Sequence, residues 1–194
     1  LLSYRYCQST KGGIKLHTLY EITTQIPAFV HITPASVHDT NAMAVIPYEC
    51  GAYYIFDRGY MDFARLYALS RHSAYYVIRA KRNLKIEILE NFGTNDCPEI
   101  LSDQLVRLDG FYSYLDYPEN FRRVRYYDKE TQRLFTYLTN NMEITADQVA
   151  LLYKNRRYYK CLEYHCLIKH PLSSFLTMLK ITISKNFFIT NNCP

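Results

Sequence analysis

The segment "AYYIFDRGYMDFARLYALSRHSAYYVIRA" (52–80) constrains the fold more than any other part of the chain. The run 52–56 is continuously apolar, and the run 74–80 is apolar except for Arg79; both have the length and character of strands buried on both faces. Between them, apolar residues recur at helical spacing at Phe63, Leu66, Tyr67 and Leu69. A strand, a helix and a strand in this order predict a βαβ unit with two parallel strands, and therefore the α/β fold class.

A single carboxylate, Asp57, directly follows the first of these runs, and Gly59 then lets the chain turn away. The carboxyl ends of parallel strands are where open α/β sheets place their ligands. A carboxylate at such a place is a suitable oxygen ligand for a divalent metal. The alternative is an ordinary turn-forming or helix-capping aspartate, which a lone Asp-x-Gly favours.

The rest of the chain reads as further strands and helices. Residues 12–22 and 28–33 predict an antiparallel hairpin, and Asp39 stands where the N-cap of a short helix would stand. Short strands separated by Gly, Pro, Asn and Asp follow Lys81, and a helix begins after Thr145. We predict a partial catalytic core over 1–80, a β-rich insertion over 81–140, a C-terminal core helix over 141–170 and a divergent tail over 171–194.

The two ends of the sequence have unusual features. Glu163 is the only acidic residue after Arg157, although the chain has 18 acidic residues. This abrupt shift indicates either a segment translated in another reading frame or a divergent end. The chain opens on Leu1 and its first methionine is Met43, from which we expect that the beginning of a longer protein is missing.

Charge and cysteine usage set weaker bounds. The net charge of +5 permits a nucleic-acid partner without requiring one, because charged runs are usually solvated faces. The six cysteines form no CxxC pair, and no secretory signal is visible, so we expect free thiols and a cytoplasmic location. Cys161, His165, Cys166 and His170 match no common zinc spacing. Lys180 and Lys185 interrupt the apolar stretch after Phe175, which argues against a membrane span.

Seven motifs occur in one order along the chain: "KGGIKLHT", "TPASVHD", "FDRGYMDF", "YYVIRAKRN", "RRVRYYDKET", "LTNN" and "LLYKNR". This series, from residue 11 to about 156, resembles the DDE-class transposases of bacterial insertion sequences, in the family typed by insertion sequence four. The resemblance implies a ribonuclease-H-like mixed sheet in which two Asp and one Glu hold two divalent metals, normally Mg²⁺. Such a pair activates the attacking oxygen and stabilises the leaving one in DNA cleavage and strand transfer.

Carried over residue by residue, the resemblance places the second catalytic Asp at Asp57. In the final family motif, Tyr153 and Arg156 match, but Lys160 stands at the Glu position and Leu167 at that of a later Lys. Glu163 is three residues late and is a poor substitute. No acid lies in residues 1–10 to supply the first Asp, so we expect one of three metal ligands, weak Mg²⁺ binding and no catalysis.

The resemblance also implies DNA as the partner, at insertion-sequence ends and targets, and leaves a homodimer open. The DNA contacts that we expect are Lys15, Arg79, Lys81, Arg82, Tyr153 and Arg156. A non-catalytic DNA-binding remnant and an interaction protein with solvated basic faces are the alternative functions.

The implied sheet order is 3-2-1-4-5, and its central strand one appears nowhere upstream of residue 12. Either the two halves of the sheet close on each other, or residues 1–8 fill the gap, or a strand edge stays exposed. We expect a marginally stable protein in consequence.

Overall fold

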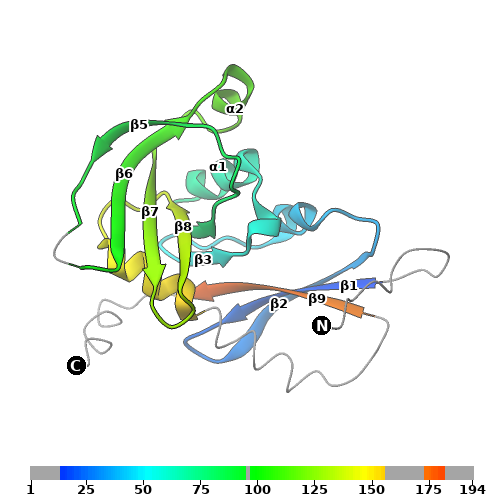
Figure 1. Ribbon diagram of the computed structural model, residues 1–194. Coiled ribbons are helices and arrows are strands. Elements are labelled where there is room, and N and C mark those ends of the chain that lie inside the picture. The colour runs from blue at the N-terminus through cyan, green and yellow to red at the C-terminus, as the bar shows by residue number, and fades with distance from the viewer. Residues whose placement is uncertain (1–13, 95–96, 156–172, 182–194) are drawn as a thin grey trace.

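The computed structural model describes residues 14–94, 97–155 and 173–181, the last of these as backbone only. Most of the described chain forms one mixed sheet in the order β2-β1-β9-β3-β4-β8-β7-β6-β5 (Figure 1). Its strands are β1 (Ile14–Glu21), β2 (Ile26–Pro34), β3 (Tyr53–Phe56), β4 (Tyr75–Arg79), β5 (Ile86–Asn91), β6 (Ile100–Leu108), β7 (Phe121–Asp128), β8 (Arg133–Thr139) and β9 (Ser173–Ile181). The chain is therefore of mixed α/β class, as predicted. None of the helices in the described part of the chain has the length and apolar character that a bilayer span requires.

The predicted βαβ unit is confirmed. β3 and β4 pair in parallel, with Tyr53 opposite Tyr75 and Phe56 opposite Ile78. They are joined through the 3-10 turn η2 (Arg58–Tyr60) and helix α1 (Phe63–Arg71). The side chain of Asp62 begins α1 by accepting a hydrogen bond from the Arg65 amide at 3.2 Å, a normal N-cap.

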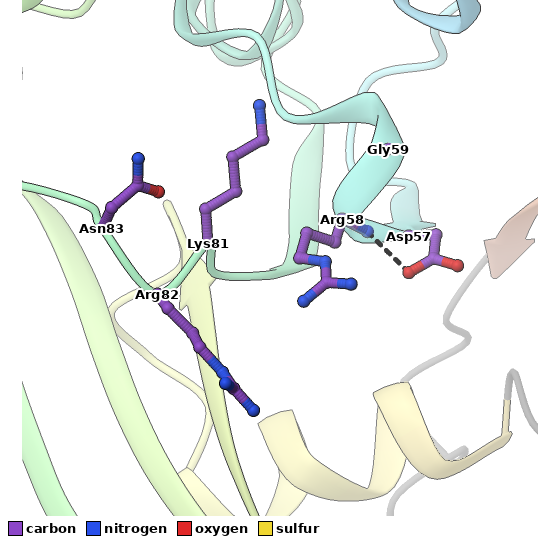
Figure 2. Close-up of a pocket in the computed structure, with 6 residues that line it drawn as sticks. All are labelled: Asp57, Arg58, Gly59, Lys81, Arg82 and Asn83. Carbon is purple, nitrogen blue, oxygen red and sulfur yellow. Dashed lines mark hydrogen bonds between the residues drawn. The ribbon is translucent and has the colours of Figure 1, made fainter.

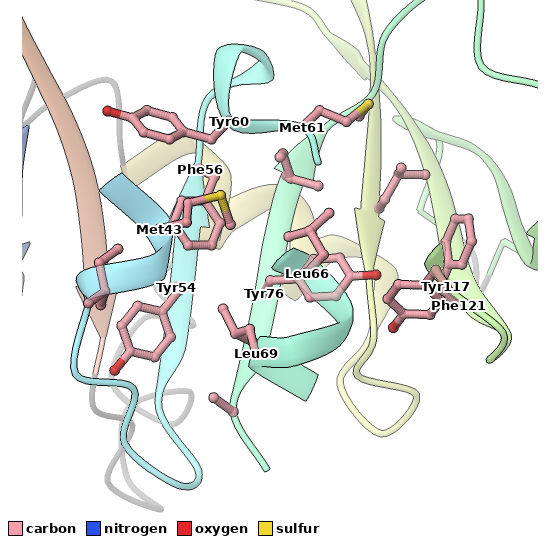
Figure 3. Packing of buried hydrophobic residues seen from close by; sticks show 14 of the residues in the cluster. Met43, Tyr54, Phe56, Tyr60, Met61, Leu66, Leu69, Tyr76, Tyr117 and Phe121 are labelled. Carbon is pink, nitrogen blue, oxygen red and sulfur yellow. The ribbon is translucent and has the colours of Figure 1, made fainter. Parts of the chain in front are cut away.

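Both faces of β3 and β4 are covered, which explains why Tyr53–Phe56 and the residues of β4 before Arg79 are apolar. On one face, side chains of β3 and β4 such as Tyr54 and Tyr76 pack with α1 and with the 3-10 helix η1 (Asp39–Val45) (Figure 3). On the other face, Ile55 and Val77 pack against the helix of residues 146–155, which contributes Val149 and Leu152. Alternation of side chains along each strand produces these two cores from one apolar run.

The segment predicted as a β-rich insertion contains strands β5 to β8. β8 pairs antiparallel with β4, placing Leu138 opposite Ile78, so these strands continue the sheet rather than stand apart from it. The structure adds a short helix, α2 (Phe111–Asp116), which the sequence analysis did not anticipate. In Figure 1 the strands β5–β8 curve upward and carry α2 at their top.

The sequence left the place of strand one in the sheet unfilled, with three alternatives for it. In the structure this place is filled by β9, which was not among those alternatives. β9, from the tail of the chain, lies between β1 and β3, parallel to β1 and antiparallel to β3. β1 and β2 form the predicted antiparallel hairpin, with His17 opposite His31. The sequence could not predict the place of β9 in the sheet, because the position of a strand along the chain does not determine which strands it pairs with.

The sequence predicted the starts of two helices, and the structure corrects the first and confirms the second. The N-cap of η1 is His38, whose side chain accepts from the Thr40 amide, and Asp39 is the first residue inside the helix. The prediction that Asp39 caps this helix was therefore wrong; its carboxylate pairs with Lys15 instead. The helix of residues 146–155 does begin after Thr145, and the Thr145 amide donates to Gln148 Oε1 at 2.9 Å, one half of a capping box.

Candidate nucleic-acid interface

An open cleft of about 520 Å³ lies where the carboxyl ends of β3 and β4 meet. Its lining residues come from the two segments that follow these strands: Asp57, Arg58, Gly59, Lys81, Arg82 and Asn83. Because β3 and β4 are parallel neighbours, both segments emerge at the same edge of the sheet. Asp57, Lys81 and Arg82, which the sequence analysis singled out, therefore lie at the same edge of the sheet.

Asp57 has a local structural role as well as a place in the cleft. Its Oδ1 accepts a hydrogen bond from the Arg58 amide at 2.6 Å, and the residue is the N-cap of η2. The side chain is half-buried. Gly59 has no positive φ, so the turn does not require glycine for its backbone conformation, contrary to the sequence-based interpretation.

Three cations line the cleft together with this carboxylate. Arg58, Lys81 and Arg82 are all exposed. In Figure 2 the guanidinium groups of Arg58 and Arg82 extend toward the same side, whereas Lys81 extends toward α1. Lys81 Nζ donates to the Met61 carbonyl oxygen at 3.4 Å, which connects the end of β4 to the start of α1. The cleft therefore has two exposed guanidinium groups and one ammonium that is tethered to Met61.

A second hollow, of about 330 Å³, continues from the first toward α2. Lys81 and Asn83 line both hollows, and Lys85 lines the second. The residues after β4 thus present positive charge along a continuous surface. This arrangement is the kind of surface on which a phosphate backbone binds.

The other residues expected to contact DNA are placed differently. Lys15 Nζ donates to Asp39 Oδ1 at 2.9 Å and to the Val37 carbonyl at 2.8 Å. The Arg79 guanidinium carbon lies 4.8 Å from the centre of the Phe135 ring. Tyr153 is only 5% exposed, and its ring centre is 4.6 Å from that of Tyr137. These three side chains are engaged within the protein, so the structure does not bring them into the cleft. Arg156 and Glu163 lie outside the described residues.

A buried polar network centred on His17 adjoins the turn that follows Asp57. His17 Nδ1 lies 3.3 Å from the Tyr60 hydroxyl, and His17 Nε2 lies 3.0 Å from Thr33 Oγ1. Burial lowers the pKa of His17, with His31 and Lys15 acting in the same direction and Asp39 opposing them. A neutral His17 therefore connects β1 and β2 to the turn that follows Asp57.

The described residues do not fit a two-metal site. Within residues 14–94 and 97–155, no group of three or more His, Cys, Asp and Glu side chains is close enough to hold a metal ion. The charged groups that line the cleft with Asp57 are cations, Arg58, Lys81 and Arg82, and they oppose the approach of a divalent metal. Mg²⁺ needs several oxygen ligands and dehydrates reluctantly.

Sequence reasoning missed two lining residues, Arg58 and Asn83. Both were present in the motifs that pointed to this place: Arg58 directly follows Asp57, and Asn83 ends "YYVIRAKRN". The signal that could have found them is position, because any residue directly after a parallel strand faces the same edge of the sheet.

The cleft at the end of two parallel strands, with one acid among cations, agrees with what comparison with known proteins shows. The family model described as "Transposase DDE domain" matches residues 3–157. The chain therefore belongs to the DDE transposase domain family, whose members typically use a divalent metal and act on DNA.

One curated relative illustrates this membership. The protein named "Putative transposase y4zB", from Sinorhizobium fredii (strain NBRC 101917 / NGR234), is 32% identical over 149 residues. The aligned part is 74% of this chain and 41% of the relative, so the chain spans less than half of the relative's length. No solved structure matches the chain.

Proposed function

We propose that this chain is part of an insertion-sequence transposase that keeps a DNA-backbone-binding cleft and has lost the metal-dependent cleavage of DNA. The observation that carries the proposal is the juxtaposition of Asp57 with Arg58, Lys81 and Arg82 at the carboxyl ends of β3 and β4. Membership of the family makes DNA the expected partner. The same proposal includes the insertion-sequence-four type, a ribonuclease-H-like core and Mg²⁺ as the metal of the family mechanism.

Electrostatics supports binding to phosphates. Three cations and one carboxylate leave the cleft with a net positive charge. Arginine binds phosphate oxygens through two parallel N–H donors, and lysine adds a point charge. Neither interaction reads bases, so the cleft would bind the DNA backbone without sequence preference.

The loss of catalysis rests on the carboxylates. Asp57 is the one acid lining the cleft among the described residues, and the spacing of the final family motif puts Lys160 where the Glu would be. A cation at that position would repel metal ions that the family mechanism requires. We therefore expect no strand cleavage or strand transfer by this chain.

DNA binding is tested by fluorescence anisotropy with a labelled duplex across a range of salt concentrations. The affinity should fall steeply as salt rises, by a slope of about 0.9 in log K per neutralised phosphate. The double substitution Lys81→Gln and Arg82→Gln should weaken binding and reduce that slope by about 2.

Arg71→Gln is the control for the loss of a positive charge outside the cleft. Arg71 is exposed at the end of α1, just before β4 begins, so it lies at the sheet edge opposite to Lys81. This change removes one positive charge but should leave the slope unaltered. Equal effects of both variants, or no binding of the parent chain at low salt, would contradict a specific cleft and favour an interaction protein.

Cleavage is tested separately with supercoiled plasmid and Mg²⁺ or Mn²⁺. We expect no nicking above that seen without protein. Metal-dependent nicking that Asp57→Ala abolishes would show that the chain is an active nuclease, and would overturn this part of the proposal while leaving DNA binding intact.

A further inference from the structure

β1 and β3 form the two walls of a slot that is one strand wide. They are not neighbours in the sheet; β9 lies between them. β9 follows β1 along its whole length, from Ser173 opposite Ile14 to Lys180 opposite Glu21. On its other side it pairs with β3 from Leu179 opposite Ile55 to Ile181 opposite Tyr53. Without β9, both walls would be open strand edges.

Contacts that do not involve β9 connect the two walls. From β1, the contacts are made by the side chains of Lys15 and His17. Their partners are residues that come before and after β3 in the chain. Lys15 Nζ donates to Oδ1 of Asp39, which precedes β3, at 2.9 Å. His17 Nδ1 lies 3.3 Å from the hydroxyl of Tyr60, which follows β3. β1 is therefore held to elements before and after β3 in the chain by contacts that are independent of β9. A binding site whose walls are already in position costs less to occupy.

The slot would bind a strand through the backbone. An extended segment placed between two open edges gains main-chain hydrogen bonds on both sides, which is the way that strand-adding sites bind peptides. An unfilled slot would expose two edges and promote aggregation. Occupancy therefore matters for the solubility of the whole chain.

The occupant of the slot lies outside the part of the chain that the family model matches, whereas the walls lie inside it. The family model matches residues 3–157, which contain both walls, whereas β9 begins at Ser173 outside the matched region. β9 is also remote in sequence from β1 and β3, so its place depends on docking rather than on a short connection.

We propose that the slot between β1 and β3 is a binding site for an extended segment, and that residues 173–181 occupy it as a separable strand. A free peptide of the same sequence should then bind to the slot when the chain's own segment is prevented from pairing. This inference does not depend on DNA binding.

The test uses the full chain with Leu179→Pro. Leu179 pairs on both sides, opposite Tyr20 and Ile55, so loss of its N–H removes a sheet hydrogen bond whichever neighbour accepts it. A fluorescent peptide of residues 173–181 should bind this variant saturably, at least about tenfold tighter than it binds the unaltered chain. Leu179→Met keeps the N–H and is the matched control, which should behave as the unaltered chain. The same peptide carrying Leu179→Pro should bind neither.

Equal binding of the peptide to the variant and the unaltered chain would overturn the proposal. Because Leu179→Pro could prevent folding, hydrogen exchange on the unaltered chain provides a second measurement. The amides of 173–181 should be protected together with those of β1. Exchange of these amides at the rate of the free peptide would show that the slot does not bind the segment.

Discussion

Lys15 and Asp39 form an ion pair that connects β1 to the start of the 3-10 helix η1. Lys15 Nζ lies 2.9 Å from Asp39 Oδ1, and Asp39 Oδ2 lies 3.8 Å from the position that a Cβ on Gly59 would occupy. Gly59 is two residues beyond Asp57 and lines the cleft. The Lys15–Asp39 pair therefore lies close to Gly59 of the cleft, and Lys15 has a structural role in joining β1 to η1.

We expect Lys15→Met to lower the free energy of unfolding by about 1 kcal/mol, since both side chains are only partly exposed and Lys15 also loses its bond to the Val37 carbonyl. Urea denaturation of Lys15→Met, Asp39→Asn and the double variant measures the coupling between the two residues. A coupling free energy near zero would show that the pair contributes nothing to stability.

Gly59→Ala should be tolerated. The residue has no positive φ, and an added Cβ would meet Asp39 Oδ2 at 3.8 Å, an ordinary contact. The free energy of unfolding should change by less than about 0.5 kcal/mol. Gly51→Ala is the comparison, because Gly51 has a φ of 76° and alanine there is strained, at a cost of about 1 kcal/mol. Similar losses for both variants would contradict this explanation.

Asp57→Asn should increase affinity for DNA in buffer containing EDTA. The change removes a negative charge from a cleft lined by Arg58, Lys81 and Arg82, and asparagine still serves as an N-cap for η2. We expect an increase of about threefold to tenfold at low salt, measured by anisotropy, that disappears at high salt. A decrease that depends on added Mg²⁺ would indicate that Asp57 holds a metal after all.

Arg122→Met should destabilise the protein strongly. Arg122 Nε lies 2.7 Å from Asp103 Oδ1, both side chains are buried, and the guanidinium also donates to the Ile144 carbonyl just before the helix of residues 146–155. Removing one partner leaves a buried unpaired carboxylate, which costs about 3–5 kcal/mol. The double variant Arg122→Met and Asp103→Leu should recover part of this loss in urea denaturation. No recovery would show that the Ile144 contact, rather than the ion pair, dominates.

Stability should fall in mild acid because of His17. Its pKa is lowered in the folded protein by burial, so the unfolded chain binds more protons than the folded one below the ordinary value. This contribution is complete above about pH 6.5 and is lost as the pH falls through that value toward the folded pKa. Unfolding by urea at pH 7.5 and 5.5 measures the difference, which His17→Gln should reduce. His72→Gln, at an exposed histidine, is the control for the loss of an imidazole.

Much of the cleft was predictable because it depends on residues close in sequence. The apolar runs of β3 and β4, with the helical spacing between them, predicted two parallel strands, and two parallel strands place Asp57 and Lys81 at one edge. What could not be predicted is which of the expected DNA-contacting side chains are available to a ligand. Lys15, Arg79 and Tyr153 are engaged with Asp39, Phe135 and Tyr137, partners that are distant in sequence.

The sequence by itself determined the local elements, the βαβ unit and the family, since periodicity, capping residues and motif order are all properties of neighbouring residues. Only the tertiary structure decided that β8 continues the sheet beside β4 and that β9 closes it between β1 and β3. The physical reason is that a strand edge offers the same row of N–H and C=O groups to any segment that can reach it. Backbone pairing therefore carries little sequence information, and the choice of partner depends on how the whole chain packs.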